Sequence, residues 1–258
     1  MCGISGALVF NKSVNRLTED YLTKIRDTMT NRGPDGGANW INSDKNVGLS
    51  HRRLSIIDLS DTANQPMSNL QKNIYIVFNG EIYNHKEIKD ELNTLKQYTW
   101  ITDHSDTEVI IHAYEQWGIE CVHKLRGMFA FALWDNTIKK LWLVRDRLGI
   151  KPLYFSFIDN KVVFASEIKA ILQDDKCKRE VNEDAFYHYL SFMTTPAPST
   201  LFKDIQKMKP GTWMCIDLNG DIEEKKYWDI WDNAKNIGDK SDEELSKMIL
   251  DELRVSVI

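Results

Sequence analysis

The chain has 258 residues, of which 42% are hydrophobic and 28% charged, and its formal net charge is −5 at pH 7. This length suits one large or two modest globular domains, and a chain this long can bury a stable core without covalent cross-links. The acidic balance and the lack of a lysine- and arginine-rich stripe in the sequence argue against nucleic acid and anionic membranes as partners.

The apolar runs and the cysteines indicate whether the chain enters a membrane, forms disulfides or binds structural zinc. The longest clean apolar run, 128–134, is far shorter than the ~20 residues that a membrane helix needs. The N-terminus does not have the pattern of a secretory signal, so the sequence predicts no membrane association. The four cysteines are scattered without a CxxC pair, which argues against a disulfide framework or a structural zinc site and favours a cytoplasmic location.

Periodicity predicts the elements of the first part of the chain. An apolar run predicts a buried strand over 4–10, and helical spacing predicts an amphipathic helix over 18–30. The glycines and proline of 32–37 predict a loop. We expect a strand pair or one long bent strand over 46–59, and a strand over 73–80 that closes with an Asn-Gly pair.

Two helices and three hairpins are expected next. The helices are predicted over 85–96 and 106–117. The hairpins are predicted to turn at 135–136, 159–160 and 219–220, where pairs of turn-forming residues separate apolar runs. In the first hairpin, phenylalanine and leucine alternate with alanine, which suits a sheet covered on both faces. Hairpin-linked strands with helices in separate blocks indicate an α+β fold with antiparallel sheets.

The last part of the chain changes in composition. A proline-rich break covers 194–200, and the polar segment 229–240 resembles a linker. Ser241 and Glu244 form a capping box before a final amphipathic helix. Its apolar side runs to the last residue, which favours a chain cut from something longer, with a docked terminal helix as the alternative.

Cys2 raises the central functional question. If Met1 is removed, Cys2 carries a thiol and a free α-amine on one carbon. Such an amine ordinarily titrates at about 7.7–8, so it can accept the thiol proton near neutral pH, as in the N-terminal threonine enzymes. The alternative is that Cys2 is an incidental small residue at the start of a strand.

Three further positions carry candidate chemistry. Asn79 and Gly80 offer an amide and a backbone donor for an oxyanion hole, or else form a plain hairpin turn. Arg52 and Arg53 lie in a strand-like run, where only one of them faces a given side and can clamp a carboxylate. Asp106 starts a helix, where it or Ser105 is either a cap or an acceptor for a substrate ammonium.

Together these segments resemble the glutaminase domain of class II glutamine amidotransferases. The resemblance is carried, in order, by MCGISG, NRGPDG, HRRLSIIDL, FNGEIYNH, SDTEVI, LRGMFAFALWD and RDRLGIKPLYF. Within that group the motifs are similar to the glutamine-hydrolysing asparagine synthetases of the bacterial B type. The resemblance implies an N-terminal nucleophile hydrolase fold, a four-layer αββα sandwich of two mostly antiparallel sheets.

The resemblance also implies roles for individual residues. Cys2 matches the nucleophile, with its own amine as the base, and Asn79 and Gly80 match the oxyanion hole. Substrate L-glutamine is then bound by Arg53 at its α-carboxylate, by Glu81 and Asp106 at its α-amino end, and by the backbone of Leu54, Ser55, Ile56 and Ile57. No metal site is implied in this chain, and the six histidines show no ligand spacing.

The implied domains are a glutaminase domain over 2–220, a terminal strand and linker over 221–240, and the first helix of a truncated synthetase domain over 241–258. ATP and magnesium are expected only in that missing C-terminal domain, which would amidate aspartate. Two alternatives stay open: a paralogue that amidates another carboxylate, such as a sugar acid or peptide, and a non-catalytic docking module. A homodimer is compatible with the resemblance.

Overall fold

The computed structural model describes residues 1–258 except 12, 56–60, 97, 235–237 and 258. The chain forms two compact units, Met1–Trp228 and Asp229–Ile258. In the described part of the chain, no helix is both long and apolar enough to cross a membrane.

The first unit contains two six-stranded sheets, counted over the residues described. Every strand pair in them is antiparallel. One sheet has the order β10 (Gln206–Lys207), β8 (Tyr154–Ile158), β9 (Lys161–Ala165), β1 (Gly3–Val9), β3 (Val47–Arg53) and β2 (Gly36–Ile41). The other has the order β12 (Ile222–Lys226), β11 (Thr212–Asp217), β7 (Lys140–Arg145), β6 (Gly127–Asp135), β5 (Ile74–Ile82) and β4 (Met67–Ser68).

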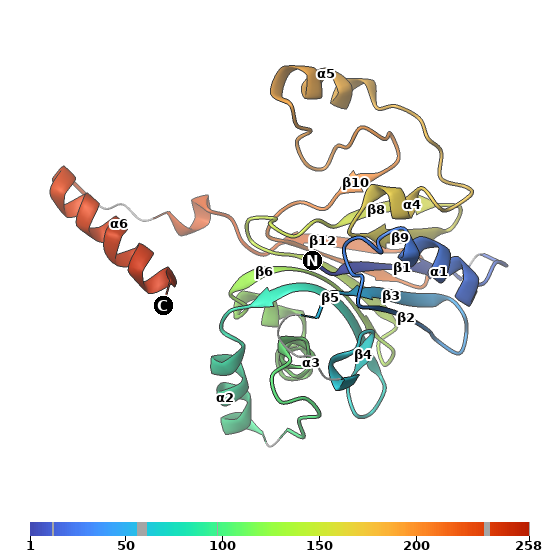
Figure 1. Cartoon of the computed structure of the whole chain (residues 1–258), viewed down its shortest axis with the longest axis horizontal. Helices are drawn as coiled ribbons and strands as arrows, with labels where there is room; N and C mark the ends of the chain where they lie inside the picture. Colours follow the sequence, from blue (N-terminus) through green and yellow to red (C-terminus); the bar gives the residue numbers. More distant parts are fainter. Residues whose placement is uncertain (12, 56–60, 97, 235–237, 258) are drawn as a thin grey trace. The chain divides into compact units, whose positions relative to one another are not determined.

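Helices cover the outer faces of both sheets. Figure 1 shows α2 (His85–Leu95) and α3 (Asp106–Trp117) against the sheet of β5 and β6, and α1 (Glu19–Asp27) and α4 (Ile168–Ile171) beside β1 and β9. A fifth helix, α5 (Glu183–Phe192), lies beyond β10 and has only Ala185 buried. The predicted α+β sandwich with two antiparallel sheets is therefore confirmed.

Three apolar clusters hold these layers together. One lies between the sheets and combines Ile4 and Leu8 of β1 with Ala130 and Ala132 of β6. A second joins the outer face of β5 and β6 to α2 and α3, and a third joins the outer face of β1 and β9 to α1 and α4. Each fully buried large apolar side chain contributes about 1.5–3 kcal/mol of transfer free energy.

Both faces of strand β6 are apolar, because each face packs in a different apolar cluster. Phe129, Phe131 and Leu133 belong to the outer cluster under the helices, whereas Ala130 and Ala132 face the other sheet. Large side chains therefore fill the space below the helices, and alanines allow the two sheets to approach. The predicted alternation is confirmed.

The predicted hairpins are also confirmed. In β8–β9, Ile158 pairs with Lys161, and the intervening Asp159 and Asn160 have φ values of 45° and 60°. Positive φ at both turn residues gives the tight turn that suits twisted strands. The β11–β12 hairpin closes in the expected place. The β6–β7 hairpin is present, but its connection is 136–139 and not 135–136, because Asp135 still pairs with Lys140.

One sequence expectation about β5 is wrong. The strand does not close at Asn79–Gly80 but continues to Ile82, with Asn79 opposite Ala130 and Gly80 opposite Phe129. The alternative of a hairpin turn at this pair is therefore excluded, because pairing with β6 holds both residues in extended backbone. The expected strand over 46–59 is β3 up to Arg53, and 56–60 fall outside the described residues.

The second unit contains helix α6 (Asp242–Val257). The expected capping box is present: the Ser241 N–H donates to Glu244 Oε2 over 2.9 Å, and the Glu244 N–H donates to Ser241 Oγ over 3.3 Å. These two bonds satisfy backbone donors that the first turn of a helix leaves without partners.

Candidate functional site

A cavity of about 130 Å³ opens where the start of β1, the ends of β3 and β5 and the start of α3 come together. Its lining contains every described residue that the sequence analysis placed in the site: Cys2, Arg53, Leu54, Ser55, Asn79, Gly80, Glu81 and Asp106. Ile56 and Ile57, which were also expected there, lie outside the described residues. Segments that are far apart in sequence, such as those of Cys2 and Asp106, thus meet in one place.

Cys2 comes directly before β1, which is an inner strand of its sheet. Because β1 pairs with both β3 and β9, the chain end is held in the sheet. The Leu54 N–H donates to Cys2 Sγ over 3.4 Å, and Sγ lies 3.6 Å from the Leu54 carbonyl oxygen. Arg32 Nε donates to the Cys2 carbonyl oxygen over 3.0 Å. These contacts fix the sulfur at the cavity wall.

Asn79 brings an unused donor to the same cavity. Val77 faces the other sheet and Phe78 the helices, so the alternation of β5 turns Asn79 toward the space between the sheets. The side chain is only 2% exposed, and its Nδ2 has no hydrogen-bond partner among the described residues. A buried amide without a partner is costly, so this donor is available to an acceptor that enters the cavity.

Gly80 is required by close packing. A Cβ atom there would lie 2.2 Å from the Met128 carbonyl oxygen and 2.7 Å from Phe129 Cα. Because only glycine lacks a Cβ atom, only glycine allows the β5 backbone to approach β6 this closely beside the cavity.

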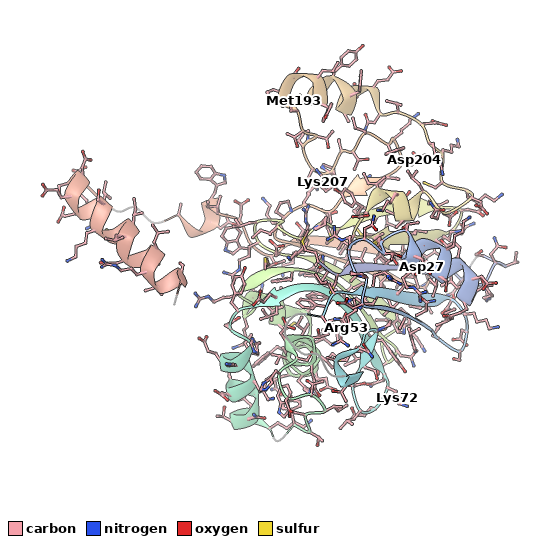
Figure 2. The ribbon with its side chains drawn as sticks, in the orientation of Figure 1. Asp27, Arg53, Lys72, Met193, Asp204 and Lys207 are labelled. Atoms are coloured by element: carbon pink, nitrogen blue, oxygen red, sulfur yellow. The ribbon has the colours of Figure 1, made fainter. Side chains whose placement is uncertain are left out.

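The two neighbouring arginines face opposite ways. Arg52 Nε donates to the Gly33 carbonyl oxygen over 2.9 Å, and its Nη1 lies 3.4 Å from Asp27 Oδ1. Arg53 instead lines the cavity, where its Nη1 donates to Asn64 Oδ1 over 2.5 Å. Figure 2 labels Arg53 at the end of β3 and Asp27 at the end of α1.

Asp106 provides a buried carboxylate at the start of α3. It is 6% exposed, and its Oδ2 accepts a hydrogen bond from the Ile82 N–H over 3.0 Å. Burial raises the pKa of Asp106 to about 6, and the nearby Glu81 adds to this, although the backbone hydrogen bonds oppose it. Ser105 is the cap residue of α3 but makes no side-chain capping bond.

Four polar residues of the lining were not expected from the sequence: His51, Gln65, Thr107 and Lys151. Burial lowers the pKa of His51 to about 3, so this side chain is neutral. Gln65 Oε1 accepts from the Phe78 N–H over 2.6 Å, and its Nε2 donates to Thr107 Oγ1 over 3.2 Å. Gln65 therefore ties β5 to α3. No local pattern marks these residues, because only the fold brings them to the cavity.

Comparisons with known proteins agree on one family. Residues 1–228 match the family described as "Glutamine amidotransferase domain". Asparagine synthetase [glutamine-hydrolyzing] 1 of Bacillus subtilis is 41% identical over 233 residues, which are 88% of this chain and 35% of that protein. Amidase chry2 of Gibberella zeae is 32% identical over 271 residues, which are 100% of this chain and 39% of that protein.

A solved structure has a similar fold. Glutamine phosphoribosylpyrophosphate amidotransferase from B. subtilis matches with a TM-score of 0.65 and 16% identity, over 88% of this chain and 49% of that one. The present chain thus spans less than half the length of each of these three proteins.

Proposed function

This chain belongs to the glutamine amidotransferase domain family, and we propose that it hydrolyses the side-chain amide of L-glutamine at the cavity beside Cys2. The observation that carries the proposal is the meeting of a sulfur atom, Cys2 Sγ, and an unpartnered buried amide, Asn79 Nδ2, in the lining of one cavity. A nucleophile and an oxyanion donor are the two groups that acyl transfer needs most.

The charges of the lining suit a free amino acid. Arg53 supplies a cation for the α-carboxylate, and Asp106, with Glu81, supplies an anion for the α-ammonium. Both charged groups of the substrate are then paired, which avoids the cost of several kcal/mol for a buried charge without a partner. Leu54 and Ser55 also line the pocket. We propose that their backbone, with that of Ile56 and Ile57, contributes to glutamine binding.

The reaction proceeds through a thioester. The α-amine of Cys2 takes the thiol proton, and the thiolate attacks the side-chain carbonyl carbon of glutamine. The Asn79 amide and the Gly80 N–H stabilise the resulting oxyanion. The amine returns the proton to the leaving nitrogen, so ammonia departs and a γ-glutamyl thioester remains. Water then attacks this thioester, which releases glutamate and restores the thiol.

This mechanism requires removal of Met1. While Met1 is attached, the Cys2 nitrogen belongs to a peptide bond and cannot accept a proton at neutral pH. Cysteine is small enough to permit removal of the preceding methionine, and removal creates the amine next to the thiol.

The ammonia is proposed to serve an ATP-dependent amidation in a further domain outside these residues. The relative from B. subtilis named an asparagine synthetase supports aspartate as the acceptor. ATP and magnesium would be bound in that domain, and the boundaries 2–220, 221–240 and 241–258 remain our proposed division of this chain. Not every relative is named an asparagine synthetase, since that from G. zeae is named an amidase, so the alternative of another acceptor, such as a sugar acid or peptide carboxylate, stays open.

Ammonia release from glutamine by the processed chain tests the proposed function. Cys2→Ala is expected to abolish release while the melting temperature stays near that of the wild type. Cys177→Ala, which removes a thiol outside the cavity lining, is the matched control and is expected to keep full activity. Turnover by Cys2→Ala would place the nucleophile elsewhere, and inactivity of the correctly processed wild type would refute the proposed function.

A further inference from the structure

Lys151 is a cation at the active cavity that the mechanism above does not use. It follows β7, lines the cavity together with Cys2, and is only 7% exposed. Lysine is rarely buried to this extent without a paired acid, so its position calls for a function.

The backbone of Lys151 is held firmly in place. Its N–H donates to Asp146 Oδ2 over 2.9 Å, and its carbonyl oxygen accepts from Arg145 Nε over 2.7 Å. The fully buried Asp146 carboxylate also accepts from the Phe129 N–H, at the residue that pairs with Gly80. The loop that carries Lys151 is therefore fixed relative to the proposed oxyanion hole.

The ammonium group lies at the Met1 end of the cavity. Lys151 Nζ is 3.6 Å from Met1 Sδ, a weak acceptor, and it forms no salt bridge with any described carboxylate. The charged groups next to the Lys151 backbone are Arg145 and Asp146, and the Asp146 carboxylate accepts backbone N–H bonds. The other charged or titratable groups around this space are Arg32, which is paired with Glu167 at 3.3 Å, and the lining residues Cys2, Arg53, His51, Glu81 and Asp106. Of these, His51 is neutral, and Glu81 and Asp106 stand at the proposed substrate-ammonium end.

Removal of Met1 changes this corner. The Lys151 ammonium loses its thioether contact, and the new α-amine of Cys2 is created where Met1 was attached. Two positive charges close together are unfavourable, and the group that holds its proton less tightly gives it up. A neutral amine can in turn accept a hydrogen bond from an ammonium.

We propose that Lys151 is a positioning residue that keeps the α-amine of the processed Cys2 unprotonated, and therefore competent as the base, by placing an ammonium at the same end of the cavity. The inference rests on the proposed function for its catalytic consequence, but the state of the amine can be measured without glutamine. The covalent chemistry is unchanged, since Lys151 neither gives nor takes a proton in the reaction.

The experiment compares processed wild type, Lys151→Met and Lys151→Arg. The pH dependence of acetylation of the residue-2 amine by acetic anhydride is read by mass spectrometry, and kcat/KM for glutamine is measured over the same pH range. In Lys151→Met both profiles are expected to move to higher pH by about one unit. That shift lowers kcat/KM about tenfold at pH 6.5 and leaves it near the wild-type value at pH 9. Lys151→Arg is expected to keep the wild-type profiles.

Lys207→Met is the matched control, because Lys207 (labelled in Figure 2) is also partly buried but donates to the Thr195 carbonyl oxygen outside the cavity lining. It is expected to change neither profile. Unmoved profiles in Lys151→Met, or an equal loss of activity at every pH, would overturn the proposal. The acetylation profile decides the matter even if the wild type does not turn over glutamine, so failure of the proposed function is seen separately.

Discussion

Asn79→Ala separates a catalytic role of the side chain from a structural one. Asn79 Nδ2 has no hydrogen-bond partner among the described residues, so its removal breaks no bond made by that donor. The melting temperature should therefore change little. If the amide stabilises the oxyanion, its loss should lower kcat by about 10²–10³-fold, or about 2.7–4 kcal/mol of barrier, with a small effect on KM.

Asn69→Ala is the matched contrast for this prediction. Asn69 is also buried, but its Nδ2 donates to Asn73 and Glu115, and its Oδ1 accepts from the Asn73 and Ile74 N–H groups. Its loss is expected to cost about 1–3 kcal/mol of unfolding free energy, seen as a lower melting temperature, with kcat unchanged. The assay is steady-state ammonia release with thermal melts of both variants. An Asn79→Ala enzyme that keeps kcat within about threefold of wild type would refute the assignment of the donor.

Two further predictions concern substrate binding. Arg53→Ala should raise KM for glutamine at least about tenfold, because a substrate carboxylate is left without its pair. Arg52→Ala should leave KM unchanged, although it removes the contacts of Arg52 with Gly33 and Asp27. The reverse result would mean that the wrong arginine has been assigned. Glutamine binding should weaken as the pH falls through about 6, where Asp106 takes up a proton, and Asp106→Asn should raise KM and remove this dependence. Because the pKa of Asp106 is raised from 3.8 to about 6 in the folded chain, this carboxyl lowers stability as the pH rises between those values. Asp106→Asn should therefore melt at a higher temperature at pH 7, and an unchanged or lower melting point would contradict that argument.

Local patterns were sufficient for most of the fold. Helices α2 and α3 were expected from apolar spacing, and the β8–β9 turn follows from Asp159 and Asn160, which tolerate positive φ. These features depend on residues close together in sequence. Helix α5 was not expected from the sequence, because its single buried residue leaves little amphipathic pattern to detect.

Several features of the site could not be predicted from local sequence patterns. Asn79–Gly80 has the sequence of a hairpin turn, but pairing with β6 keeps it extended, so a long-range contact overrides the local preference. His51, Gln65 and Lys151 reach the cavity only because β3, the segment before β4 and the loop after β7 converge there. The family resemblance located the lining residues that were expected, because its motifs come from the segments that the fold brings together.

The most direct test of the whole account compares two preparations of the chain that differ only in Met1. Intact mass identifies the processed form and a form in which processing is blocked, and ammonia release from L-glutamine is measured for each. We expect the processed chain to turn over glutamine and the Met1-bearing chain to be essentially inactive, although both fold. Equal activity with Met1 still attached would contradict the claim that Cys2 supplies both the nucleophile and its base.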